Sequence, residues 1–168
     1  MPFRIRPFQK TDFDALWRMD QICFDPQLAY SRPELAFYMR RPGAFTLVAE
    51  SVADEASHSA PVAAKIVGFI VAEARSQAGH IITIDVLPEI RRAGIGSSLL
   101  RAAEDRLRAA GATVVELETA VNNAAAIQFY KRKEYFVEKT VSGYYSNHLD
   151  ALVMRKELST TRALKQNL

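Results

Sequence analysis

Cysteine is almost absent from this chain of 168 residues, which contains only Cys23. A disulfide scaffold is therefore excluded, and a reducing compartment fits the composition. The chain also lacks an apolar run of about 20 residues, so we expect no membrane-spanning segment and no membrane partner. Its N-terminal residues lack the apolar core of a signal peptide, which favours a cytoplasmic location.

A large excess of one charge sign is also missing, because 22 Lys and Arg residues stand against 19 Asp and Glu residues. The net charge of +3 favours an anionic ligand but is too small to indicate a nucleic-acid partner. The histidines are His58, His80 and His148, far apart in sequence. With one cysteine they predict no metal site, and we interpret them as surface or turn residues.

Hydrophobic residues make up 49% of the chain and charged residues 24%. This composition is typical of a globular protein and excludes a disordered one. The length predicts one domain, which we assign to residues 1–158. Residues 159–168 are polar and are predicted to form a C-terminal tail.

The first half of the chain predicts two helices and an antiparallel meander. The segment Thr11–Asp14 resembles a capping box and predicts a helix over residues 13–24. Ser31 begins a second helix, which ends near residues 41–43. Strands joined by short connections follow, with a loop at 54–61. The predicted strands are residues 3–6, 44–52, 62–74 and 79–87.

The second half alternates between strand and helix patterns. A helix is predicted over residues 94–110, a strand over 114–119 and a helix over 124–133. This order indicates a βαβ unit with parallel pairing. Two more strands, at 137–145 and 151–158, complete a mixed α/β (α+β) sheet with helices on both faces.

The turn before the helix at 94–110 carries the clearest chemical signal. Its sequence, RRAGIGS at residues 91–97, places two glycines where a helix begins. Unpaired N–H groups and the helix dipole make such a turn suitable for phosphate. Leu99 replaces the third glycine of a dinucleotide fingerprint, and no lysine precedes Ser97 as a P-loop requires.

The motif RRAGIG at residues 91–96 resembles the acetyl-CoA pyrophosphate loop of the GNAT (GCN5-related N-acetyltransferase) superfamily. Residues 117–130 (LETAVNNAAAIQFY) and 143–154 are similar to segments of N-terminal amine acetyltransferases. The bacterial ribosomal-protein alanine N-acetyltransferases (RimI type) are the most alike. The resemblance covers nearly all of residues 3–158 and implies a mostly antiparallel sheet of about seven strands.

The same resemblance implies roles for individual residues. Glu118 matches the general base, Tyr130 the general acid, and Asn123 a residue that binds the pantetheine arm of acetyl-CoA. A bulged strand is expected to hold the pantetheine and the acetyl carbonyl through Ile84, Asp85 and Val86. The implied pyrophosphate loop consists of Arg91, Arg92, Ala93, Gly94, Ile95, Gly96 and Ser97.

Elementary chemistry agrees with these assignments. Acetyl transfer needs a neutral amine, and the carboxylate of Glu118 can take the proton of an α-ammonium group. The hydroxyl of Tyr130 can donate a proton to the leaving thiolate. Cys23 is expected to lie away from these motifs, so we favour direct transfer over a cysteine-linked intermediate.

Structural interpretations of the same residues remain open. Glu116 and Glu118 share one face of their strand, so either can be the exposed carboxylate. Tyr130 can act by packing alone, and Asn123 is a good helix N-cap. Asp85 points either into the acetyl channel or towards the amine as a second acid. The segment 131–133 (KRK) meets the CoA 3′-phosphate or forms a solvated helix end.

The chain departs from the family pattern at two places. Ala120 replaces a frequent arginine, which leaves the acceptor site less defined. Residues 133–135 (KEY) replace Leu-Gly-Phe. Because Glu134 replaces the glycine, we expect the helix-to-strand turn to be built differently.

The leading hypothesis is an acetyl-CoA-dependent N-acetyltransferase that acts on a protein N-terminus. The inference of a peptide acceptor rests on the resemblance at Tyr144, Tyr145 and the first helix, which in the family contact the peptide. The alternatives are acetylation of a small amine (aminoglycoside, polyamine or amino acid) and a non-catalytic acyl-CoA-binding module. The sequence leaves open whether the chain is a monomer or a dimer.

Overall fold

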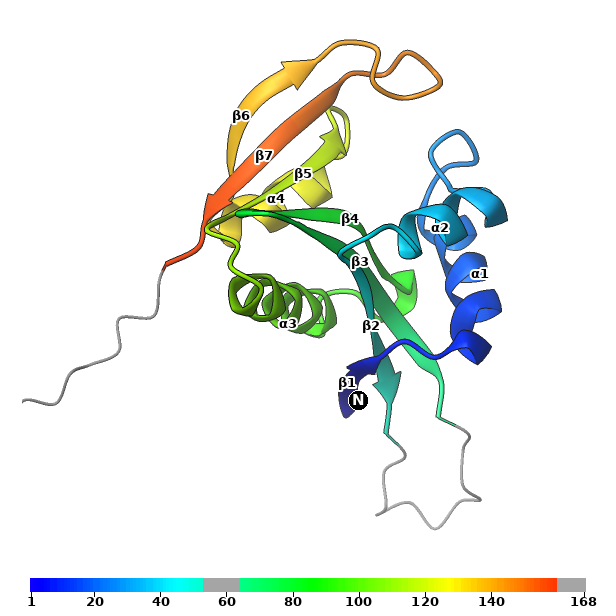
Figure 1. The fold of residues 1–168 in the computed structure, drawn as a ribbon. Helices are drawn as coiled ribbons and strands as arrows, with labels where there is room; N and C mark the ends of the chain where they lie inside the picture. The colour runs from blue at the N-terminus through cyan, green and yellow to red at the C-terminus, as the bar shows by residue number, and fades with distance from the viewer. Residues whose placement is uncertain (53–63, 160–168) are drawn as a thin grey trace, which may run out of the picture.

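One seven-stranded sheet organises the computed structural model, which describes residues 1–52 and 64–159 (Figure 1). The strand order is β1-β2-β3-β4-β5-β7-β6, and only the β4–β5 pair is parallel. The predicted mixed, mostly antiparallel sheet is therefore confirmed. Its strands are β1 (Phe3–Pro7), β2 (Ala44–Ser51), β3 (Ile66–Arg75), β4 (Ala78–Val86), β5 (Val114–Ala120), β6 (Phe136–Val141) and β7 (Ala151–Glu157).

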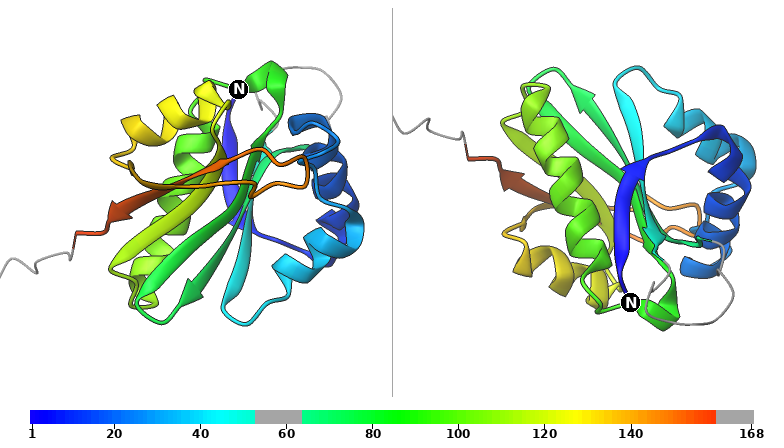
Figure 2. Two further views of the ribbon diagram at one scale, coloured as in Figure 1. Left: turned by 90° about the horizontal axis from the view of Figure 1, so that it is seen from above. Right: turned by 90° about the horizontal axis from the view of Figure 1, so that it is seen from below.

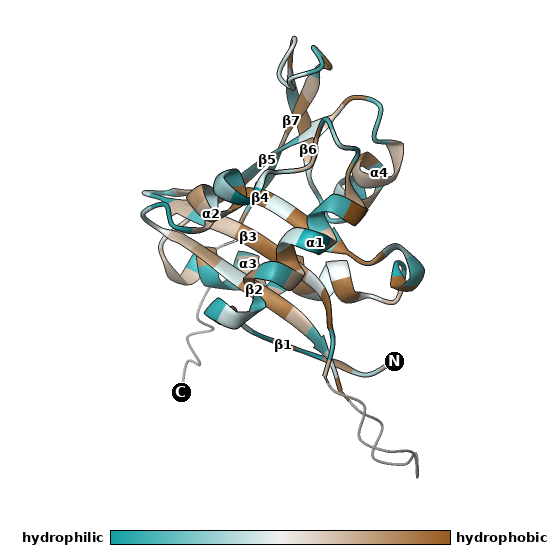
Figure 3. Ribbon diagram, turned by 90° about the vertical axis from the view of Figure 1, so that its right-hand side faces the viewer, coloured by the Kyte–Doolittle hydropathy of each residue, from teal (hydrophilic) through white to brown (hydrophobic). Residues whose placement is uncertain are grey.

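Helices cover both faces of this sheet, as Figure 2 shows. One face carries α3 (Ile95–Ala109) and α4 (Ala124–Arg132), and the other carries α1 (Phe13–Cys23) and α2 (Arg32–Met39). Each face has its own apolar core, and the central strands that separate the two cores are strongly hydrophobic (Figure 3). Within the described residues, no helix combines the length and apolar character needed to cross a membrane.

The strands β4 and β5 pair over only four residues each, from Ala78 opposite Val114 to Ile81 opposite Leu117. Beyond that point β4 stays with β3 up to Val86, whereas β5 stays with β7 up to Ala120. The two strands therefore separate (Figure 1). Backbone groups on the facing edges of both strands are left without a strand partner.

A bulge in β4 coincides with this separation. Val71 lies opposite Thr83 and Ala72 opposite Ile81, so Ile82 is the extra residue. Such a residue bends its strand and increases the local twist. The sequence places the bulged strand correctly, but the bulge itself precedes Ile84 by two residues.

Two local predictions are wrong. The capping box predicted at Thr11 lies instead at the short 3-10 helix Lys10–Asp12, where Gln9 is the N-cap and donates its backbone N–H to the Oδ2 of Asp12 at 2.7 Å. The carboxylate of Asp12 also accepts two hydrogen bonds from Arg6, at 2.8 and 3.0 Å. The strand predicted to reach Tyr145 ends at Val141.

Some predicted segments lie outside the described residues. They are the loop at 54–61, the first two residues of the strand predicted at 62–74, and residues 160–168 of the tail. Within the described part, that strand begins at Ile66.

The turn between α4 and β6 keeps a left-handed residue although it lacks glycine. Glu134 has φ +69°, a conformation that costs an L-residue about 1–2 kcal/mol. The next residue, Tyr135, is buried, and its hydroxyl donates to Glu104 at 2.9 Å. The expectation of a differently built turn is thus wrong, since Glu134 itself adopts the conformation that glycine favours.

Replacing Glu134 by glycine is expected to stabilise the protein. Relief of the left-handed strain exceeds the added chain entropy of glycine, so the free energy of unfolding should rise by about 0.5–1 kcal/mol. Urea denaturation measures this change. Lys133→Gly is the matched control, because φ is −98° there and glycine only adds entropy. Equal losses in both variants would contradict the argument.

Candidate active site

The predicted phosphate turn forms the entrance to α3. Gly94 is the N-cap residue with φ +84°, and Arg92 is also left-handed with φ +67°. Among the residues that the structure describes, no side chain caps this helix, so the N–H groups of its first turn have no side-chain partner there. An added Cβ at Gly96 would lie in ordinary van der Waals contact, 3.5 Å from the ring of Phe129 and 3.7 Å from Val86. The turn therefore presents backbone donors beside the end of β4.

The two arginines of this turn have different surroundings. Arg91 Nε donates to the carbonyl oxygen of Val86 at 3.0 Å, which ties the turn to β4. Both side chains are exposed, but within residues 1–52 and 64–159 no hydrogen bond holds the side chain of Arg92.

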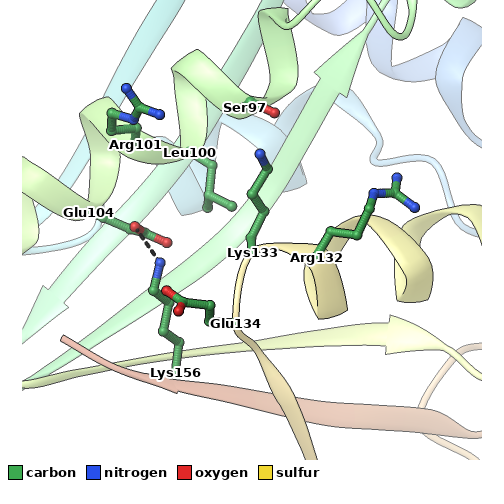
Figure 4. Close-up of a pocket in the computed structure, with 8 residues that line it drawn as sticks. All are labelled: Ser97, Leu100, Arg101, Glu104, Arg132, Lys133, Glu134 and Lys156. Carbon is green, nitrogen blue, oxygen red and sulfur yellow. Dashed lines mark hydrogen bonds and ion pairs between the residues drawn. The ribbon is translucent and has the colours of Figure 1, made fainter.

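A basic pocket of about 310 Å³ adjoins the turn (Figure 4). Ser97 and Arg101 of α3 form one wall, and Arg132 and Lys133 at the end of α4 form another. Glu104 of α3 also lines the pocket and accepts a hydrogen bond from Lys156 at 3.0 Å. The cationic end of α4 therefore lies next to the first turn of α3, where an anion would be stabilised.

The last residues of β4 alternate between the two faces of the sheet. Ile84 and Val86 pack towards the core under α3 and α4. Asp85 points to the other face and is 1% exposed, and Thr83 Oγ1 donates to its Oδ1 at 2.8 Å. Burial, and then the charge of Asp20, raise the pKa of Asp85 well above its usual value.

Cys23 lies next to the predicted cofactor strand, contrary to expectation. Its Sγ donates to the carbonyl oxygen of Val86 at 3.4 Å, because the C-terminal end of α1 packs on β4. Burial and the charge of Asp85 raise the pKa of this thiol to about 11. A protonated thiol is a poor nucleophile, so direct transfer remains the favoured route.

Glu118 has a histidine partner that the sequence analysis missed. Its Oε2 lies 2.6 Å from His80 Nε2, and both side chains are partly exposed. His80 is in β4, so its interpretation as a surface or turn residue is wrong. The contact could have been inferred from the predicted parallel pairing of residues 79–87 with 114–119, because such pairing places the polar face of one strand beside that of the other. Glu116 is the residue opposite His80 in the parallel register, but its side chain accepts from Arg155 at 3.3 Å.

A second carboxylate lies on the other side of His80. Glu73 of β3 is the antiparallel partner of His80 and is buried. Burial raises the pKa of Glu73, but the neighbouring Arg75 and Arg41, at 2.8 and 3.2 Å, lower it by more. His80 therefore lies between two carboxylates that come from different strands.

Tyr130 and Asn123 both belong to α4. Tyr130 is buried, with its ring edge-on to Phe129 and Tyr135. Burial and the charge of Asp85 raise the pKa of its hydroxyl, which keeps the proton that a general acid needs. Asn123 caps α4, since its Oδ1 accepts from Ala126 N at 3.1 Å. The amide nitrogen of Asn123 is left for another partner.

The β6–β7 loop approaches the α1–α2 connection. Ser146 Oγ donates to the carbonyl oxygen of Gln27 at 3.1 Å, across 119 residues of sequence. Tyr144 and Tyr145 lie in this loop with ring centroids 5.0 Å apart. Burial and then the charge of Glu118 raise the pKa of Tyr144.

Comparison with known proteins identifies the family. Residues 13–135 match the family described as acetyltransferase (GNAT) family. The chain belongs to this family. An N-acetyltransferase of Methanocaldococcus jannaschii, described as uncharacterized, is 30% identical over 154 residues, which is 91% of this chain and 90% of that protein. N-alpha-acetyltransferase 20 of Dictyostelium discoideum is 34% identical over 56% of this chain and 57% of its own length.

Solved GNAT structures share the fold. Ard1 of Thermoplasma volcanium superposes with a TM-score of 0.80 at 25% identity, covering 95% of this chain and all of that one. The ribosomal-protein-S18-alanine N-acetyltransferase of Escherichia coli has a TM-score of 0.77 at 21% identity, covering 99% of each chain. The implied GNAT fold and the acetyl-CoA-dependent N-acetyltransferase class are thus confirmed.

Gly94→Ala is expected to weaken acetyl-CoA binding by this GNAT protein about tenfold, the equivalent of 1.4 kcal/mol. Alanine strains the left-handed residue and turns the N–H groups at the start of α3 away from their present direction. The dissociation constant for coenzyme A, measured by calorimetry, reports the change.

Gly111→Ala is the matched control at the opposite end of α3. Gly111 also has positive φ, +97°, and an added Cβ would have nothing within 4 Å at either glycine. Both variants should lose about 1–2 kcal/mol of stability, but only Gly94→Ala should lose affinity. Equal affinities would refute the phosphate role of this turn.

Proposed function

We propose that this protein acetylates the N-terminal α-amino group of a protein or peptide. One observation carries the proposal: Glu118 and His80 lie where β4 and β5 separate, beside the tyrosines of a loop that is tied to the α1–α2 connection. The N-alpha-acetyltransferase names of several relatives support the same acceptor class.

The residues that hold the cosubstrate lie on the α3–α4 side. The backbone N–H groups of residues 94–97 bind the pyrophosphate, with Arg92 and the basic pocket of Figure 4 adding positive charge. The backbone of Ile84 to Val86, which has no strand partner on the β5 side, and the amide of Asn123 bind the pantetheine arm. The thioester then lies between β4 and β5, the place where their pairing ends.

Three groups move or hold protons in the proposed reaction. Glu118, hydrogen-bonded to His80, accepts the proton of the attacking amine. A free backbone N–H at the end of β4 stabilises the negative oxygen formed on attack. Tyr130 donates its proton to the departing thiolate. The three groups belong to β5, β4 and α4. We infer that the acetyl group reaches all three only because β4 and β5 separate at this point.

An acceptor panel tests the proposed function. The panel contains peptides with free and blocked N-termini, a polyamine, an aminoglycoside and free amino acids, and mass spectrometry locates the acetyl group. We expect acetylation of free N-termini only. Acetylation of the small amines alone would show that the acceptor is a small amine and not a protein N-terminus. Coenzyme A binding without any turnover would indicate a non-catalytic module.

Glu118→Gln and Tyr130→Phe are expected to lower kcat about 10²- to 10⁴-fold, because each removes one proton-transfer group. Coenzyme A binding should persist in both variants. Glu116→Gln is the matched control, since Glu116 shares the strand face of Glu118 but pairs with Arg155. A similar loss of kcat in Glu116→Gln would contradict the assignment of the base.

A further inference from the structure

Two carboxyl groups are buried on either side of the α1–β4 contact. Asp20 of α1 is fully buried, and Asp85 of β4 is 1% exposed. The contact between these elements is direct: Cys23, one helical turn after Asp20, donates to Val86, the residue after Asp85. The two carboxyl groups therefore belong to one buried interface.

Each carboxyl group uses one oxygen and leaves the other without a partner. Asp20 Oδ2 accepts from the backbone N–H of Tyr30 at 2.7 Å and from Gln21 at 3.2 Å. Asp85 Oδ1 accepts from Thr83 at 2.8 Å. Among the described residues, Asp20 Oδ1 and Asp85 Oδ2 have no hydrogen-bond partner. A buried polar atom without a partner is costly and calls for an explanation.

Two ionised carboxylates would be unstable in this interface. Buried charges need a paired cation, and the only cation among the described groups that act on Asp85 is Arg91, which is exposed and bonded to Val86 O. One proton between the free oxygens would satisfy both and remove one charge. The other titratable groups that act on the pair are Cys23, Tyr30, Glu34 and Tyr130.

We propose that Asp20 and Asp85 share one proton, with the Asp85 carboxyl group donating to Asp20 Oδ1, and that this pair positions the acceptor side of the site. Burial raises the pKa of Asp20 to about 6. The raised pKa of Asp85 makes it the member that keeps the proton. These shifts agree with the direction of the hydrogen bond.

The pair links the cofactor strand to the acceptor side. Asp85 lies between Ile84 and Val86, and Asp20 holds the backbone of Tyr30 in the α1–α2 connection. Loss of the proton would place two negative charges in the interface and push α1 from β4. The acceptor KM should then rise as pH passes the pKa of the pair. This positioning effect rests on the proposed function, whereas the shared proton does not.

Asp85→Asn tests the proton directly, because the side-chain N–H of asparagine donates to Asp20 Oδ1 at every pH. The folded protein holds a proton that the unfolded chain releases above about pH 4. Relative to Asp85→Asn, the unfolding equilibrium constant of the unmodified protein should therefore rise roughly tenfold per pH unit, up to the pKa of the pair. Parallel pH curves would overturn the proposal.

Infrared spectroscopy of the unmodified protein gives an independent readout. A neutral carboxyl band should persist at pH 7 and disappear in Asp85→Asn. Should that variant fail to fold, ¹³C-carboxyl NMR of the unmodified protein replaces it, and ordinary aspartate titration of both groups would refute the pair. Neither measurement needs an acceptor, so both remain decisive if the proposed function fails.

Steady-state kinetics test positioning. With saturating acetyl-CoA, the peptide KM of the unmodified protein should rise at high pH while that of Asp85→Asn stays level. Asp85→Ala removes the partner of Asp20 and should have a raised peptide KM at every pH. If Asp85→Asn keeps the low KM, the effect depends on the hydrogen bond to Asp20 and not on packing alone. The same KM profile in the unmodified protein and in Asp85→Asn would overturn the positioning role.

Discussion

The separation of β4 from β5 is the constraint on which the rest of the structure depends. The strands pair as far as Ile81 and Leu117, and then each follows its antiparallel partner. Pairing with β3 and β7 on the outer edges continues, so the sheet remains continuous while the backbone groups on the facing edges of β4 and β5 lack a strand partner. The phosphate turn, Glu118 and Tyr130 all lie around this opening, although they belong to α3, β5 and α4.

The two faces of the sheet carry different parts of the proposed site. The face under α3 and α4 supplies the phosphate turn, the basic pocket and the buried phenol of Tyr130. The opposite face supplies His80, Glu118 and the tyrosines of the β6–β7 loop. Since alternate residues of β4 point to opposite faces, one strand serves both sides. Asp85 and Val86, adjacent in sequence, consequently meet different surroundings.

Much of the fold was predictable because its signals are local. Apolar periodicity identified the helices that cover the sheet, and the glycines of residues 94–96 marked the start of α3. The motif around Glu118, Asn123 and Tyr130 predicted the candidate site by resemblance. Local signals failed where a partner is distant: they indicated neither the bond between Asp12 and Arg6 nor the contact of Cys23 with β4.

The sequence alone determined the family, the mixed sheet and the identity of the candidate residues, because these follow from short patterns of side-chain type and spacing. Only the tertiary structure decided which carboxylate meets a histidine, where the bulge falls and which buried oxygens lack partners. These properties depend on strand register and helix packing, and a shift of one residue in register moves a side chain to the other face. No short segment contains that information, since each contact joins elements that lie far apart in the chain.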